Sequence, residues 1–233
     1  MFRTDIESLL LSLATERRLF WSEADFQFAF AWKIQQNYPS AKIRLERRQE
    51  ITNSKKPAYV DIWVELDNKI YPIELKYKTR TYQAADLNGE VIRTKTHSAR
   101  DVGRHSYLKD IERIENYSYV DGFERGFAII ITNDEHYYNP ELAPSGTTDE
   151  DFVIHEGKTI KRDKKMVWHS SKPWALSLGS ITLRHDYQMK WSLYSRSEDN
   201  KGDFKYAIAE INKRGRPKMS FCHEASWPLF SGD

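Results

Sequence analysis

The sequence predicts an α/β fold in which helices flank a mixed central sheet and a β-rich C-terminal elaboration follows. Two helical stretches open the chain, a hairpin of alternating residues occupies 59–78, and a third helical stretch precedes an apolar run at 126–132. With 233 residues, the chain is long enough for one domain with its own hydrophobic core. We therefore expect 1–233 to be a single domain, with its core in 1–135 and a β-rich extension in 150–212.

The first elements are predicted to be two helices and a strand. Apolar residues recur at helical spacing over 5–17, which predicts the first helix. The second is predicted to begin at Ser22, a good N-cap, and to end before Pro39. It is apolar on nearly all sides, which predicts that it is buried. Alternation over 41–50 predicts the strand that follows.

Residues 59–78 predict a β-hairpin, because apolar and polar residues alternate on both sides of Asp67–Asn68. Both of these residues tolerate positive φ, as a two-residue hairpin turn requires. Such a turn pairs Leu66 with Lys69. A four-residue loop gives the same pairing, whereas a three-residue loop would break it.

The predicted register places three charged side chains on one face of the hairpin. Asp61 lies directly opposite Glu74, with Cβ atoms about 4.5–5.5 Å apart, and Lys76 shares the face. A divalent cation would remove the repulsion between the carboxylates, and Mg²⁺ binds one or two carboxylates together with waters and substrate phosphate oxygens. The alternative is a solvated hairpin face with a salt bridge. Trp63 and Pro72 on the polar faces favour a central hairpin instead.

Asp61, a spacer and then Glu74-Leu75-Lys76 resemble the active-site signature of the PD-(D/E)XK nucleases, the restriction-endonuclease-like superfamily. The resemblance covers the first 135 residues and departs at Val60, which stands where the motif's name has proline. It implies a restriction-endonuclease-like core and a metal-dependent nuclease that hydrolyses phosphodiester bonds. The expected type is a DNA endonuclease of restriction, defence or repair, and the alternative is a non-catalytic nucleic-acid-binding protein that retains the fold.

The resemblance also implies a set of site residues. Catalytic roles fall to Asp61, Glu74, Lys76 and Glu23, and the metal ligands would be Asp61, Glu74 and the carbonyl of Leu75. The implied cofactor is Mg²⁺, with Mn²⁺ as a substitute, and the implied partners are double-stranded DNA and a second copy of the chain. Glu23 enters as an acidic residue on the first core helix, with Asp25 as the alternative. Its other explanation is a favourable interaction with the helix dipole.

Basic residues near the hairpin are candidates for contact with nucleic acid. Asn88–Gly89 predicts the turn of a projecting β-ribbon at 81–96, which is either a contact to a nucleic-acid backbone or a solvated hairpin. A helix is predicted over 99–117, capped by Ser98, and its arginines either bind phosphate or pair with neighbouring carboxylates. The sequence at 213–218 matches the core of an AT-hook or is a charged turn. The candidate nucleic-acid-binding residues are Lys78, Arg80, Arg93, Lys95, Arg100, Arg104, Arg214 and Arg216.

The remaining elements are predicted to be strands. The apolar run at 126–132 is typical of a strand buried on both faces. Further strands are predicted at 152–155, 159–161, 181–185, 189–194 and 204–211, which extend the sheet or wrap around it.

Composition bounds the remaining possibilities. The formal net charge is only +2, so a basic surface has to be local. The single cysteine, Cys222, excludes an intramolecular disulfide and a cysteine-based zinc site. The first residues do not resemble a signal peptide, and no long apolar run is present, so we expect a cytoplasmic protein without a membrane partner.

Overall fold

The structure is a computed structural model that describes residues 6–49, 58–197 and 202–213. The helices are α1 (Ile6–Ala14), α2 (Glu23–Asn37), α3 (Arg100–Tyr117) and α4 (Pro173–Leu178), with two 3-10 turns, η1 (Pro140–Leu142) and η2 (Glu150–Phe152). The strands are β1 (Lys42–Gln49), β2 (Ala58–Leu66), β3 (Lys69–Lys78), β4 (Gln83–Ala85), β5 (Val91–Arg93), β6 (Arg125–Thr132), β7 (Thr159–Ile160), β8 (Lys165–Met166), β9 (Ile181–Thr182), β10 (Tyr187–Gln188), β11 (Trp191–Ser195) and β12 (Phe204–Asn212).

Six of the strands form one mixed sheet in the order β1-β2-β3-β6-β12-β11. β3 and β6 are parallel, whereas the other neighbours are antiparallel. Parallel neighbours need a crossover connection, and α3 supplies it. The predicted order of helix, strand, hairpin, helix and strand is confirmed, as is the mixed α/β class.

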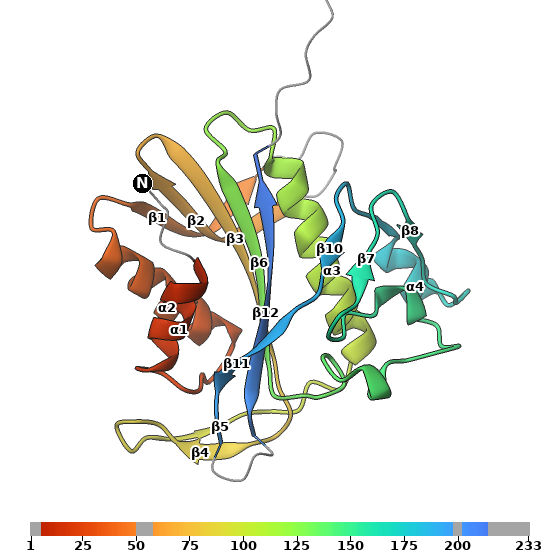
Figure 1. Cartoon of the computed structure of the whole chain (residues 1–233), viewed down its shortest axis with the longest axis horizontal. Coiled ribbons are helices and arrows are strands. Elements are labelled where there is room, and N and C mark those ends of the chain that lie inside the picture. The colour runs from red at the N-terminus through yellow and green to blue at the C-terminus, as the bar shows by residue number, and fades with distance from the viewer. Residues whose placement is uncertain (1–5, 50–57, 198–201, 214–233) are drawn as a thin grey trace, which may run out of the picture.

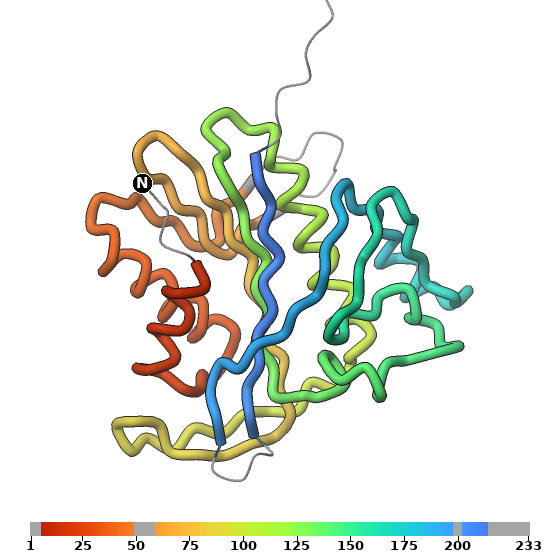
Figure 2. The backbone as a smooth tube through the Cα atoms, viewed as in Figure 1, coloured from red at the N-terminus to blue at the C-terminus, as the bar shows by residue number. Residues whose placement is uncertain are grey.

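Helices cover both faces of this sheet (Figure 1). α1 and α2 pack on one face and share a hydrophobic core with Ile129 and Ile131 of β6. α3 packs on the other face and shares a second core with Ala128 and Ile130. β6 is therefore buried on both faces, as its continuous apolar sequence predicts. The tube in Figure 2 shows that the segment from β7 to β10 forms a further layer outside α3.

The β2–β3 hairpin has the predicted register. Leu66 pairs with Lys69, and the turn residues Asp67 and Asn68 have φ angles of 51° and 59°. Both angles lie in the left-handed region that a two-residue hairpin turn requires. The position of every residue along β2 relative to β3 follows from this turn.

β4 and β5 form the predicted ribbon, which lies below α1 and α2 in Figure 1. Its loop is closed by Asp86, whose Oδ1 accepts hydrogen bonds from the N–H groups of Asn88 (2.9 Å) and Glu90 (2.8 Å). Gly89 has a φ of 81°, which explains a glycine at this position. The base of the ribbon is anchored, because Ile92 is buried in the core beneath α1 and α2.

Three local predictions are wrong. α2 is not buried on all sides, because Phe28 and Trp32 are 60% and 55% exposed on the side that does not face the sheet. The N-cap of α3 is Ala99, which makes no side-chain cap, and not Ser98. Residues 152–155 continue from η2 without forming a strand, although their apolar side chains enter the core outside α3.

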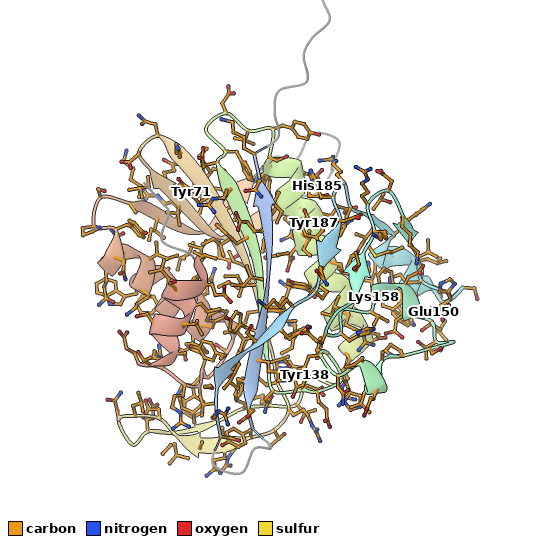
Figure 3. All side chains as sticks on the ribbon, in the orientation of Figure 1. Tyr71, Tyr138, Glu150, Lys158, His185 and Tyr187 are labelled. Carbon is orange, nitrogen blue, oxygen red and sulfur yellow. The ribbon has the colours of Figure 1, made fainter. Side chains whose placement is uncertain are left out.

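Two of the C-terminal strands, β11 and β12, extend the central sheet. β12 pairs along its whole length with β6, and β11 pairs with β12. The strands predicted at 159–161 and 181–185 are shorter than expected and belong to two-stranded sheets outside α3. His185 and Tyr187, labelled in Figure 3, connect this layer to α3, because both side chains bind the buried carboxylate of Glu115.

Two of the predicted features lie beyond the described residues. These are the basic residues Arg214 and Arg216 of the AT-hook-like sequence, and the single cysteine, Cys222. Within the described ranges, no helix has both the length and the apolar character that crossing a membrane requires.

Candidate active site

β2 and β3 separate just beyond the pair formed by Ile62 and Ile73, where their ladder ends. Asp61 and Glu74 are the next residues along the two strands, but the ladder does not reach them, so the predicted pairing of Asp61 directly opposite Glu74 is not formed. The two carboxylates still interact, because Asp61 adds to the raised pKa of Glu74. The carboxylate of Asp61 takes over the role of a strand partner, because its Oδ2 accepts a hydrogen bond from the N–H of Leu75 at 2.6 Å. The end of the ladder thus holds an acidic side chain in place between the strands.

Glu23 lies on the same edge of β3, one step further along. Its Oε2 accepts hydrogen bonds from the N–H of Tyr77 (2.8 Å) and from Nζ of Lys78 (3.2 Å). Two carboxylates from different elements therefore bind the N–H groups of β3 where β2 no longer does. The alternative, Asp25, forms an ion pair with Arg17 at 3.0 Å. Of the two acids, Glu23 is the one that contacts β3.

A distortion in β1 and β2 accompanies this arrangement. The β1–β2 ladder skips Glu46, whose φ of 49° is rare for a residue other than glycine. Gln27 of α2 bridges the gap, because its Nε2 donates to Glu46 Oε1 (2.8 Å) and to the carbonyl oxygen of Asp61 (2.6 Å). Beyond Asp61 the strand changes face, since Val60 packs on the α3 side whereas Ile62 packs on the α2 side.

The side chains of Glu74 and Lys76 are paired with two residues of α3. Arg113 Nη1 lies 2.8 Å from Glu74 Oε1, and Lys76 Nζ lies 2.6 Å from Asp110 Oδ2. Arg113 Nη2 also lies 3.5 Å from Asp110 Oδ1, and Lys76 donates to the carbonyl oxygen of Leu75 at 3.0 Å. Asp110 and Arg113 complete the cluster, and our sequence analysis did not identify either of them as a site residue.

A sequence signal for Asp110 does exist. Tyr107, Ile111 and Ile114 form the buried stripe of α3, and Asp110 lies within that stripe at i+3 from Tyr107 and i−4 from Ile114. A carboxylate on the buried side of a helix requires a partner in the core. Arg113 follows one turn later, at i+3 from Asp110.

Burial sets the electrostatics of the cluster. It raises the pKa of Asp61 to about 6, although the Lys76 ammonium and a backbone N–H oppose the shift. It also raises the pKa of Glu74, where the nearby carboxylate of Asp110 adds to the effect and Arg113 opposes it. The pKa of Asp110 is raised by burial too, against the effect of Lys76. Burial alone would lower the pKa of Lys76, but the surrounding carboxylates raise it overall.

The donor set is compatible with a magnesium ion but not with a cage made of protein side chains. Within the described residues, no group of three or more His, Cys, Asp or Glu side chains is arranged to hold a metal. Mg²⁺ commonly uses only one or two carboxylates and completes its shell with water and substrate oxygens. Asp61 and Glu74 provide two, and Glu74 Oε2 is buried without a hydrogen-bond partner. A buried acceptor in this state is costly, and a cation would satisfy it.

Four of the candidate nucleic-acid-binding residues lie around the ribbon. Lys78 pairs with Glu23, and Arg80 lies 3.6 Å from Glu135 on the surface. Arg93 is exposed and donates to a glutamine of the same ribbon, and Lys95 is also exposed. Arg80, Arg93 and Lys95 are exposed, whereas Lys78 is half-buried.

The two arginines of α3 named as candidates have internal partners. Arg100 Nε donates to the buried carboxylate of Asp134 at 2.6 Å. Arg104 is buried and forms an ion pair with Asp149. Pairing with carboxylates was the alternative for both residues, and the structure has that arrangement.

No protein-family model, no curated protein and no solved structure matches this chain. The fold that accompanies the cluster is a mixed six-stranded sheet with helices on both faces.

Proposed function

We propose that this protein is a metal-dependent nuclease of the PD-(D/E)XK type that hydrolyses phosphodiester bonds in DNA. The observation that carries the proposal is the meeting of Asp61, Glu74 and Lys76 at the point where β2 and β3 separate. The surrounding order of helix, strand, hairpin, helix and strand supports it, because the resemblance implies a restriction-endonuclease-like core of this kind. The biological role in this proposal is restriction, defence or repair.

The metal ligands in the proposed site are the carboxylates of Asp61 and Glu74 and the carbonyl of Leu75. A bound Mg²⁺ would polarise a phosphoryl oxygen and lower the pKa of a bound water, which would make a hydroxide nucleophile easier to form. Lys76 remains protonated, because the neighbouring carboxylates raise its pKa. Its ammonium therefore acts as a hydrogen-bond donor that orients the attacking water or holds the phosphate, and not as a base. Glu23 fixes the edge of β3 that carries these groups.

The proposed contact with the nucleic-acid backbone is the basic ribbon surface, which we define as Lys78, Arg80, Arg93 and Lys95. These residues lie at the end of β3 and along the ribbon that follows it. Phosphate contacts by lysine and arginine give affinity that is independent of base sequence. We leave Arg100 and Arg104 out of this surface because buried carboxylates, those of Asp134 and Asp149, bind both guanidinium groups. The carboxylates that pair with Lys78 and Arg80, by contrast, are partly exposed.

A second candidate is a nucleic-acid-binding protein that keeps the fold without cleaving its ligand. The observation that favours it is the closure of the cluster by ion pairs. The side chain of Glu74 is fully buried against Arg113, and Lys76 is paired with Asp110. A binding protein needs none of these groups to be free, whereas a nuclease has to open the cluster to a metal and a phosphate.

Cleavage of supercoiled plasmid separates the two candidates. Wild type, Lys76→Ala and Lys161→Ala would be compared with Mg²⁺, Mn²⁺ or EDTA. Lys161 is a matched control because it forms an exposed ion pair with Asp186 outside the cluster. The nuclease predicts metal-dependent nicking that Lys76→Ala abolishes and Lys161→Ala retains. Binding to DNA that Lys76→Ala leaves unchanged, without cleavage by wild type, would support the second candidate.

A further inference from the structure

We infer that Arg113 is a resident counter-ion of Glu74 that a divalent cation displaces when it binds. This inference rests on the proposed metal site and assigns a role to a residue of α3 that the resemblance does not include. In the metal-free protein Arg113 is paired with Glu74. The exchange of its guanidinium for a divalent cation therefore determines how readily the site accepts a metal.

The position of Arg113 supports the inference. Its Nη1 lies 2.8 Å from Glu74 Oε1, and its side chain is 27% exposed whereas that of Glu74 is 0% exposed. Arg113 is therefore a partly exposed partner of a carboxylate that solvent does not reach. Arg113 also donates to the carbonyl oxygen of Tyr59 on β2 at 3.4 Å, so it connects α3 to the strand that carries Asp61.

The charges of the cluster show what Arg113 contributes. Asp61, Glu74 and Asp110 carry three negative charges when ionised, and Lys76 and Arg113 carry two positive charges. The cluster therefore has a net charge of −1 in that state. Without Arg113 it would have a net charge of −2, with the buried carboxylate of Glu74 uncompensated.

A divalent cation and Arg113 compete for the same carboxylate. Glu74 Oε2 is buried without a hydrogen-bond partner, so Glu74 retains an acceptor for a second cation. A cation bound there would lie close to the guanidinium, and two like charges at such a separation repel strongly inside a protein. Arg113 is the more exposed of the two cations, and its second contact, with Asp110 at 3.5 Å, is longer than the 2.6 Å contact between Lys76 and Asp110. Arg113 is therefore the cation that can move out into solvent.

If Arg113 competes with the metal, Arg113→Ala should increase the affinity for a divalent cation. A residue that only supports the fold would, when removed, leave metal affinity unchanged or weaken it. A competing counter-ion, when removed, leaves a more negative site that binds a divalent cation more tightly. We expect the dissociation constant for Mn²⁺ or Mg²⁺ to fall at least about tenfold, which corresponds to ~1.4 kcal/mol of binding free energy.

The test is metal binding by the full chain without nucleic acid. Mn²⁺ and Mg²⁺ would be titrated into wild type, Arg113→Ala, Arg113→Gln and Arg113→Lys by calorimetry, with the metal-induced rise in Tm as a second measurement. Arg113→Lys keeps the charge and should bind metal about as weakly as wild type. Arg100→Ala is the matched control, because Arg100 is also partly exposed on α3 and also binds a buried carboxylate, that of Asp134.

Folding has to be checked first, because removing one partner of a buried ion pair often destabilises a protein strongly. Circular dichroism would establish that each variant is folded. Arg113→Gln carries the comparison if Arg113→Ala is unfolded, since glutamine retains a hydrogen-bond donor without the charge. A metal-induced rise in Tm that is larger in Arg113→Gln than in wild type would support the same conclusion.

The outcomes separate this inference from the proposed function. Tighter binding in Arg113→Ala or Arg113→Gln, but not in Arg100→Ala, supports the exchange. If wild type binds metal through Asp61 and both neutral variants of Arg113 bind it no more tightly, the inference is wrong and the metal site stands. If wild type binds no divalent cation, and Asp61→Asn behaves identically, both the inference and the proposed metal-dependent function are wrong.

Discussion

The side chain of Asp61 occupies a place in the sheet that a backbone carbonyl would otherwise fill, because its carboxylate accepts the N–H of Leu75 at 2.6 Å. This bond fixes an acidic group between two strands that have begun to separate. The carbonyl of Asp61 is held in turn by Gln27, so the residue is positioned from both sides.

The first prediction concerns the pH dependence of stability. The folded-state pKa of Asp61 is about 6, above its usual value of 3.8, so between these values the folded protein holds a proton that the unfolded chain releases. The free energy of unfolding should therefore fall as pH rises from about 4 to about 6, by on the order of 2 kcal/mol for this residue. Urea unfolding of wild type and Asp61→Asn, metal-free, would measure it.

Asp61→Asn removes this titration but keeps an oxygen that can accept the N–H of Leu75. The difference in stability between the two proteins should change in favour of the variant as pH rises to 6 and then stay constant. Glu74 and Asp110 also have raised pKa values, but they titrate in both proteins and largely cancel in the difference. A difference that does not vary with pH would contradict the assignment.

A second prediction isolates the backbone strain at Glu46. Glu46→Gly and Glu46→Ala both remove the carboxylate that Gln27 binds, so they differ only in how well they tolerate a φ of 49°. Glycine adopts this conformation without the steric cost that alanine has, and Glu46→Gly should be the more stable variant by roughly 1 kcal/mol. Chemical denaturation of the pair would show it. Equal stabilities would mean that β1 relaxes to ordinary strand geometry once the side chain is gone.

A third prediction compares a buried ion pair with an exposed one. Asp110→Ala leaves the Lys76 ammonium without its closest partner in a site where both side chains are largely buried. Breaking such a pair typically costs about 3–5 kcal/mol. Asp186→Ala removes an exposed partner of Lys161 and should leave the urea midpoint almost unchanged. Similar midpoints for the two variants would show that water replaces Asp110 readily.

A fourth prediction addresses the basic ribbon surface. If Arg93 and Lys95 contact phosphates, the double variant Arg93→Ala/Lys95→Ala should bind DNA more weakly and lower the slope of log K against log salt by about 2. Lys158→Ala/Lys161→Ala is the control, because these lysines flank β7 in the layer outside α3, where Figure 3 labels Lys158. Binding measured by fluorescence anisotropy at several salt concentrations gives both slopes. A ribbon that is only a solvated hairpin would leave the two slopes equal.

Sequence patterns predict the hairpin and its register as far as the pair of Ile62 and Ile73, because both depend on local rules. Alternation assigns residues to faces, and a two-residue turn fixes the register. The partners from α3 could not be placed in this way, since Asp110 and Arg113 reach the site only through the crossover that packs α3 on the sheet. The distortion at Glu46 was also missed, because it depends on a contact from Gln27 on a different helix.

The wrong predictions about α2 and about residues 152–155 have similar causes. Phe28 and Trp32 give α2 an apolar sequence on all sides, but periodicity cannot show whether anything covers the outer side. Residues 152–155 are apolar enough for a strand, yet they pack against α3 without a strand partner. In both cases the residues are as apolar as predicted, but hydrophobicity alone does not determine which element packs against them.

The pairing of β12 with β6 has a consequence for how the protein can be made. β12 lies between β6 and β11, so a ribosome would synthesise the chain as far as Asn212 before the sheet could close. A fragment that ended at residue 135 would present the apolar β6 as an open edge, the kind of surface that promotes aggregation. The first 135 residues contain the proposed site, but β12 is the strand that covers the edge of β6.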